Sequence, residues 1–235
     1  MTQVKRIYET AAAEPAGEEG YRVVLDGRPV RTPGGKPLTV PTAALAEALA
    51  AEWDAQEEEI QPHTMPLTQL ACTALDQVAD ERAGMEEAVA RFAGTDLLCY
   101  RADAGSSLAE RQAEAWQPLL DWAAETFGAE LAVTEGIMPV TQPEETVTAL
   151  AEAAAAVEDM RFAALQCVTA AAGSLVLALA LLHGARDAEQ VIAAAELDEI
   201  WQEEFWGADP EQVARREGRA RDIRAAARLL ALLDR

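Results

Sequence analysis

The chain has 235 residues, of which half are hydrophobic, and its 41 acidic and 19 basic residues give a formal net charge of −22. The apolar content excludes an intrinsically disordered chain, and the negative charge disfavours binding to nucleic acids or to anionic membrane surfaces. Two His and three widely spaced Cys residues form no zinc-type motif, so we expect free thiols in a reducing compartment, without a metal or another cofactor.

The first part of the chain predicts an antiparallel β meander. Short runs rich in Val, Leu and Thr are separated by turns that contain Gly or Pro. The dipeptide Asp26-Gly27 accepts the positive φ angles of a tight hairpin. We expect strands at residues 21–25, 28–32 and 37–40, with residues 5–8 as a further candidate.

A helix is expected to follow the meander from about residue 41. Leu45, Leu49 and Trp53 recur every four residues and form an apolar stripe that can cover one face of the sheet. Two prolines at residues 62 and 66 then interrupt helical structure. We therefore predict an N-terminal α+β domain at residues 1–66 and a larger C-terminal helical domain at residues 67–235, which is an α+β fold class.

The second domain is predicted to be almost entirely helical. The expected helices are 67–79, 85–92, 107–127, 144–157, 160–183, 187–206 and 210–233, with an extended stretch at 133–140. Residues 162–182 carry no charge and are long enough to cross a membrane. Polar Gln166, Thr169 and Ser174 lie within this run, so we interpret it as a helix at the centre of the domain.

The C-terminal segment differs in charge from the rest of the chain. Residues 214–235 contain seven Arg and only three acidic residues. We interpret this segment as a basic helix, in preference to a nucleic-acid patch. Its positive charges compensate the acidic remainder of the chain and the negative C-terminal end of its own helix dipole.

Catalytic motifs are scarce in this sequence. It contains neither the G-x-S-x-G of serine hydrolases nor the P-loop of nucleotide-binding proteins. Its many carboxylates leave a carboxylate-dependent hydrolase of unknown substrate as the alternative to a binding protein.

Two clusters combine acids with tryptophans. The first surrounds Trp53, and the second is the run from Leu197 to Gly207. Either the aromatics are core and the acids a solvated face, or the clusters form a protein-docking surface in which tryptophan supplies contact area and the acids select a basic partner. Our candidate partner-binding residues are Asp198, Glu199, Gln202, Glu203, Trp206, Trp53 and Asp54.

Short segments along the chain match, in order, the motifs of one known family. They are Val24–Pro33, Glu52–Gln56, Met65–Thr68, Thr73–Asp76, Thr95–Ala102, Trp116–Pro118, Ser174–Ala180, and Trp201-Gln202 with Trp206-Gly207. Each motif is short, but their number and order are specific. Nearly the whole chain thus resembles the assembly chaperones that protect the alpha subunit of ATP synthase.

The resemblance implies a binding protein and not an enzyme. Such a chaperone holds the free alpha subunit of ATP synthase on the surface that later contacts beta, prevents its aggregation, and is displaced by beta. The acidic positions that the family uses map to Asp198 and Glu199, with Gln202 in the family's Gln place. Ile200 departs from a position that is often acidic.

The resemblance also bears on location and assembly. No transit peptide is evident, which suggests a bacterial, cytoplasmic member, whereas eukaryotic relatives act in the mitochondrial matrix. We expect the free protein to be a monomer that binds no nucleic acid and is not an integral membrane protein.

Overall fold

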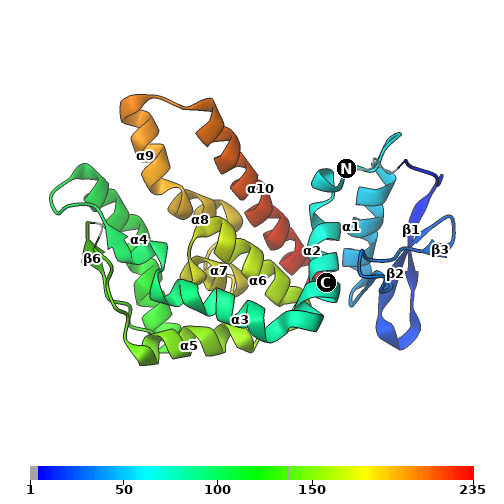
Figure 1. Cartoon of the computed structure of the whole chain (residues 1–235), viewed down its shortest axis with the longest axis horizontal. Coiled ribbons are helices and arrows are strands. Elements are labelled where there is room, and N and C mark those ends of the chain that lie inside the picture. Colours follow the sequence, from blue (N-terminus) through cyan, green and yellow to red (C-terminus); the bar gives the residue numbers. More distant parts are fainter. Residues whose placement is uncertain (1–4, 137) are drawn as a thin grey trace. The chain divides into compact units, whose positions relative to one another are not determined.

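The computed structural model describes residues 5–136 and 138–235, which form two compact units. The first unit contains the chain up to residue 82, together with residues 159–164 and 228–235, and the second contains residues 83–158 and 165–227. Figure 1 shows a small antiparallel sheet in the N-terminal region and helices through the remainder. This confirms the predicted fold class, while the predicted boundary after residue 66 stays a prediction.

The sheet is built around one central strand. Strand β2 (Tyr21–Leu25) pairs antiparallel with β1 (Ala11–Pro15) on one side and with the short strands β3 (Arg28–Pro29) and β4 (Thr39–Val40) on the other. The turn between β2 and β3 has positive φ angles at Asp26 (48°) and Gly27 (76°), as the dipeptide predicted.

The prediction missed β1 and placed a strand too early. Residues 5–8 form only an isolated bridge, between Lys5 and Glu59. Strand β1 has the sequence Ala-Ala-Ala-Glu-Pro, which favours helix or turn by intrinsic preference. Pairing along the whole length of β2 overrides that preference, and such pairing is invisible in the local sequence.

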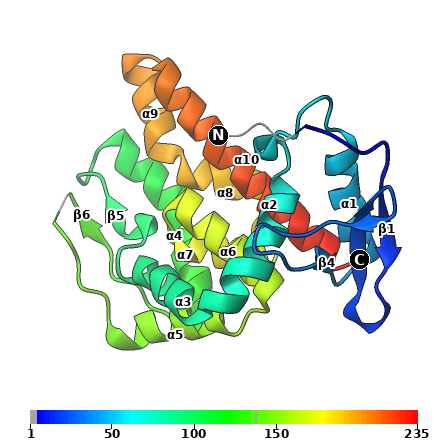
Figure 2. The same ribbon diagram turned by 45° about the vertical axis from the view of Figure 1, so that its right-hand side comes forward.

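Helix α1 (Ala43–Asp54) packs against β1 and β2, as Figure 2 shows. Thr42 caps its N-terminus by accepting a hydrogen bond from the backbone N–H of Leu45. Leu45 and Leu49 are fully buried together with Val23 of the sheet, so the predicted apolar stripe does form the core of this unit. Helix α2 (Pro66–Thr73) follows after the two prolines.

The remaining elements are mostly helices. The parallel pair β5 (Tyr100–Arg101) and β6 (Thr134–Glu135) is the exception, and β6 lies in the predicted extended stretch, of which residue 137 is outside the described residues. The helices are α3 (Ala79–Gly94), α4 (Ser107–Phe127), α5 (Glu144–Ala155), α6 (Asp159–Ala172), α7 (Leu175–Leu182), α8 (Ala188–Ala195), α9 (Leu197–Trp206) and α10 (Pro210–Leu233).

The apolar run at residues 160–183 is two helices, so the prediction of a single helix was wrong. Helix α6 ends at Ala172, the following Gly173 has a left-handed φ of 67°, and Ser174 caps α7. Almost every side chain of α7 is buried, which agrees with the predicted place at the centre of the domain. Among the residues that the structure describes, no helix has the length and apolar character needed to cross a membrane.

Two further helix predictions had the wrong bounds. The expected helix at 187–206 is divided at Glu196 into α8 and α9. The expected helices at 67–79 and 85–92 are joined, because residues 74–78 form a π-helical turn and α3 begins directly afterwards with a kink at Glu81. Such joints arise from tertiary packing and carry no Gly or Pro signal in this sequence.

Candidate docking site

Helices α9 and α10 are consecutive and are joined by ion pairs, although their ribbons diverge from the connecting turn in the view of Figure 1. Arg216 of α10 lies 2.8 Å from Glu203 and 3.3 Å from Glu196. Arg219 pairs with Glu199 one turn further along. The arginines of this part of α10 therefore neutralise the acids of α9, as the basic C-terminal segment predicted.

Helix α4 holds the opposite side of α9. Gln112 donates a hydrogen bond of 2.7 Å from Nε2 to Asp198 Oδ1, and its own Oε1 accepts the backbone N–H of Ala102 at 2.7 Å. Arg111 pairs with Glu204 at 2.9 Å. Burial raises the pKa of Asp198, and the hydrogen bond from Gln112 opposes that rise.

A buried cation lies close to this joint. Arg101 lies with its guanidinium 5.2 Å from the ring centre of Trp116 and donates a hydrogen bond from Nε to the carbonyl oxygen of Leu98. Trp116 in turn donates from Nε1 to the carbonyl oxygen of Ala194, at 2.9 Å. Burial lowers the pKa of Arg101, while the Asp198 charge favours its protonated form. The start of α9 thus rests on an ordered polar network.

The C-terminal end of α9 exposes aromatic side chains to solvent. Phe205 is 61% exposed and Trp206 is 74% exposed. Their rings and that of Trp201 form one cluster, with ring centres 4.5 Å apart for Trp201 and Phe205 and 5.8 Å apart for Trp201 and Trp206. Trp201 Nε1 donates to Ser107 Oγ at 3.3 Å, which ties this cluster to α4. We call these three residues the aromatic cluster.

The arrangement divides the predicted α9 residues into two groups. Asp198, Glu199 and Glu203 are half-buried and occupied by partners within the protein, whereas Gln202 and Trp206 are exposed. Sequence reasoning missed Phe205, because it left open whether the aromatics of this run are core or surface. None of the residues of α9 is fully buried, and Phe205 lies at the surface.

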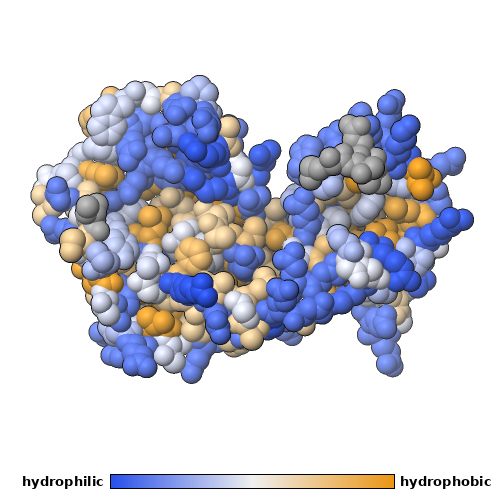
Figure 3. Space-filling model, viewed as in Figure 1, coloured by the Kyte–Doolittle hydropathy of each residue, from blue (hydrophilic) through white to orange (hydrophobic). Residues whose placement is uncertain are grey.

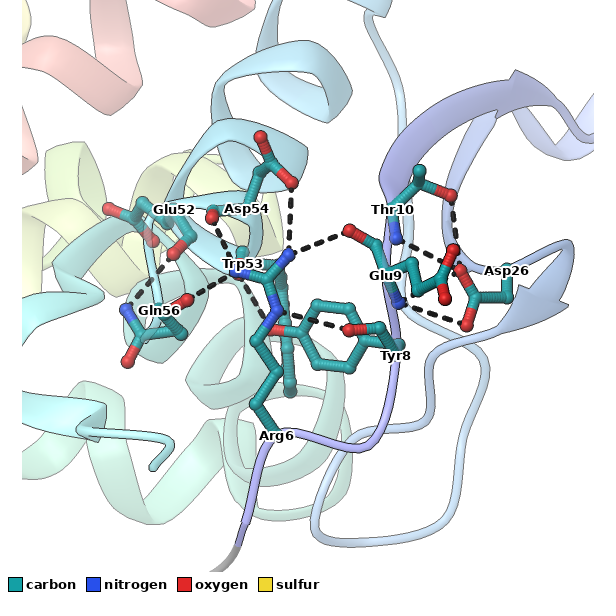
Figure 4. A network of polar contacts seen from close by, with 9 residues as sticks. All are labelled: Arg6, Tyr8, Glu9, Thr10, Asp26, Glu52, Trp53, Asp54 and Gln56. Carbon is teal, nitrogen blue, oxygen red and sulfur yellow. Dashed lines mark hydrogen bonds and ion pairs between the residues drawn. The ribbon is translucent and has the colours of Figure 1, made fainter. Parts of the chain in front are cut away.

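Trp53 and Asp54 lie in the other unit and hold the N-terminal segment (Figure 4). Arg6 donates from Nη1 to the carbonyl oxygens of Asp54 and Gln56 and from Nη2 to that of Glu9. Tyr8 donates from its hydroxyl to the carbonyl oxygen of Trp53, at 2.6 Å. These bonds satisfy carbonyl groups that the end of α1 leaves free.

The neighbouring motif residues Glu52 and Gln56 also have structural roles. The Glu52 carboxylate accepts backbone hydrogen bonds from Leu67 at 2.9 Å and from Thr68 at 2.8 Å. It therefore caps the N-terminus of α2, which Met65 does not cap with its own side chain. Gln56 Oε1 accepts the backbone N–H of Gln61, at 2.7 Å.

The structure offers few reactive groups outside these networks. Burial raises the pKa of Cys72 and of Cys167 to about 11 and that of Cys99 to about 12, so all three thiols are protonated at neutral pH. Within residues 5–136 and 138–235, no three His, Cys, Asp or Glu side chains are grouped so that they could hold a metal ion. The face drawn in Figure 3 combines hydrophilic residues, many of them at its rim, with apolar patches, some of them strongly hydrophobic.

Comparison with known proteins gives a consistent result. Residues 5–124 match the family described as ATP12 chaperone protein. The mitochondrial protein atp12 of Schizosaccharomyces pombe is 25% identical over an alignment of 228 residues, and the match covers 85% of this chain and 78% of that protein.

Two solved bacterial structures share the fold. The crystal structure of Atp12 from Paracoccus denitrificans is 39% identical, covers 98% of both chains and has a TM-score of 0.91. That of the Atu1473 protein from Agrobacterium tumefaciens is 41% identical, covers 97% of this chain and 86% of the other, and has a TM-score of 0.90. The chain therefore belongs to the ATP12 chaperone protein family, which acts in the assembly of ATP synthase.

Proposed function

We propose that this chaperone binds the free alpha subunit of ATP synthase and prevents its aggregation until beta subunits join it. The exposure of Phe205 and Trp206 at the end of α9 carries the proposal. Aromatic side chains supply large contact areas at protein interfaces, and a monomeric protein rarely leaves two of them in solvent without a binding role.

The distribution of charge indicates that the acids of α9 have a structural role, whereas its exposed aromatic residues are available to a client. The acids that face α10 and α4 are engaged by arginines and by Gln112, so they are less available to a client. Asp209 and Glu211 are exposed just beyond the aromatic cluster, and the whole chain carries a charge of −22. We infer that the client surface is apolar with a basic rim, and that long-range attraction speeds its arrival.

The buried carboxylates favour this reading over a carboxylate-dependent hydrolase. Glu52 accepts hydrogen bonds from the N-terminus of α2, Asp96 accepts the backbone N–H groups of Leu98 and Val176, and Glu196 pairs with Arg216. Each therefore has a structural partner. A catalytic acid pair of the glycosidase type would instead face a substrate cleft.

The comparisons also support a location. The two bacterial structures are 39% and 41% identical to this chain, against 25% for the mitochondrial relative. We propose that the protein acts in the cytoplasm of a bacterium, where the ATP synthase head is assembled.

Light scattering of isolated alpha subunit tests the proposal. The wild-type protein should suppress aggregation at an equimolar ratio, and a Phe205→Ser, Trp206→Ser double variant should lose most of this effect. Met138→Ser is the matched control, because Met138 is another exposed apolar side chain, 71% exposed, on the same unit. Equal protection by the double variant and the wild type would show that the aromatic cluster is not the docking surface.

A further inference from the structure

Helix α9 is held in place by polar contacts. None of its residues is buried, although Trp201 and Phe205 contact each other. Apolar burial normally fixes a helix on its neighbours, at about 25 cal/mol per Å² of surface removed from water. Leu197 and Trp201 of α9 are only partly buried, so the ion pairs and hydrogen bonds along the helix contribute much of what fixes its orientation.

Arg216 makes the least exposed of these ion pairs. Its side chain is 17% exposed, and its partners Glu196 and Glu203 are 9% and 18% exposed. The two acids are seven residues apart, which is two helical turns and therefore the same face of the helix. One guanidinium thus bridges the residue at the start of α9 and a residue in its last turn.

The other ion pairs of α9 are more open to water. Those of Arg219 with Glu199 and of Arg111 with Glu204 are exposed to a third or more of their side-chain surface. Water and salt screen such pairs, and most contribute little to stability. Removing one partner from a poorly exposed network costs more, because an unpaired charge remains.

We propose that Arg216 is the positioning residue that presents the aromatic cluster to the client, by clamping both ends of α9 onto α10. The effect on the client rests on the proposed function, whereas the role of Arg216 in fixing α9 does not. Arg216 does not itself touch the client. The acids that hold Arg216 are Glu196 and Glu203, and neither needs to face the client to act in this way.

Hydrogen exchange of the α9 amides tests the structural part without any client. Arg216→Gln should raise the exchange of residues 197–207 at least about tenfold while leaving that of α7 unchanged. Arg215→Gln is the matched control, because this neighbouring arginine pairs with Glu211 of its own helix, and the two side chains are 61% and 79% exposed. Unchanged exchange of α9 in Arg216→Gln overturns the inference.

Aggregation of the alpha subunit tests the functional part. Arg216→Gln should reduce protection at least about threefold although Phe205 and Trp206 are intact, and Arg216→Lys, which can keep one ion pair, should lie between it and the wild type. Faster hydrogen exchange of α9, combined with undiminished suppression of alpha-subunit aggregation, would also overturn the inference. The double variant at Phe205 and Trp206 tests the proposed function by itself, so the two failures are distinguishable.

A general loss of exchange protection in Arg216→Gln would indicate that the unit has unfolded. Glu203→Gln then decides, because it removes only the pair at the last turn of α9. Faster exchange near residue 203 together with weaker protection of the client supports the inference, and wild-type behaviour in both measurements overturns it.

Discussion

Gln112 and Asp198 join helices α4 and α9 through a hydrogen bond of 2.7 Å between Nε2 and Oδ1. The amide of Gln112 cannot turn over freely, because its oxygen already accepts the backbone N–H of Ala102. The Gln112 side chain is also almost fully buried, so Asp198 always meets a hydrogen-bond donor at this point.

The Gln112 contact predicts opposite outcomes for two changes at Asp198. Asp198→Asn keeps an acceptor oxygen for Gln112, so the free energy of unfolding in urea should change by less than about 1 kcal/mol. Asp198→Lys places a cation against the Gln112 amide and near Arg101, and should cost about 2–4 kcal/mol. Glu114→Lys, on the exposed face of α4, is the control and should cost less than about 0.5 kcal/mol. A harmless Asp198→Lys would contradict the structural role of this carboxylate.

Asp96 predicts a pH dependence of stability. This side chain is fully buried, and it accepts hydrogen bonds from Leu98 and Val176 at the starts of two helical segments. Burial raises its pKa from 3.8 to about 6 against the effect of these bonds. The folded state thus binds a proton more tightly than the unfolded chain does. The contribution of Asp96 to stability is greatest below about pH 4 and falls as the pH rises through about 6.

Unfolding of Asp96→Asn in urea at several pH values measures this contribution. The variant lacks the titrating group, so the difference in unfolding free energy, variant minus wild type, should rise by about 2 kcal/mol from about pH 4 to about pH 7. Loss of one hydrogen-bond acceptor shifts this free-energy difference by the same amount at every pH, so it does not affect how the difference changes with pH. A flat difference across this range would show that Asp96 titrates normally.

The capping role of Glu52 predicts a loss of stability on amide substitution. Glu52→Gln leaves one acceptor oxygen but turns an NH₂ group towards the backbone N–H of Leu67 or Thr68. We expect a cost of about 1–3 kcal/mol in urea unfolding. Glu47→Gln, on the exposed side of the same helix, should be within about 0.5 kcal/mol of the wild type. Equal effects of the two substitutions would contradict the capping role.

The hydrogen bonds of Arg6 lead us to predict that stability requires a guanidinium group at this position. Its planar fork reaches the carbonyl oxygens of Asp54, Gln56 and Glu9 at once, which a lysine ammonium cannot do (Figure 4). Arg6→Lys should therefore cost about 1–3 kcal/mol and raise the hydrogen exchange of β1. Lys5→Gln, at an exposed neighbour, serves as the control. Wild-type exchange of β1 in Arg6→Lys would contradict this role.

Local sequence was sufficient for the elements that carry their own signals. The Asp26-Gly27 turn follows from the preference for positive φ angles, and the stripe of Leu45 and Leu49 and the bounds of α4 follow from helical periodicity. Strand β1 and the break at Glu196 were missed because distant partners determine them. No periodicity in a single chain reveals a partner strand or a bridging arginine.

The sequence singled out the segment that forms α9, but not the contacts that its residues make. The run of acids and aromatics before Gly207 marked α9, yet the sequence could not show that Arg216 and Arg219 engage the acids. It also could not show that Phe205 faces solvent, since its spacing from Trp201 is that of a core stripe. Both facts depend on how α4 and α10 pack against α9.

Recovery of partners from cells tests the central claim most directly. Tagged wild-type protein should co-purify with the alpha subunit of ATP synthase without a comparable amount of beta, and the Phe205→Ser, Trp206→Ser variant should recover much less of it. Recovery of alpha and beta together in the ratio of the assembled enzyme, or recovery of neither, would contradict a chaperone of the free alpha subunit.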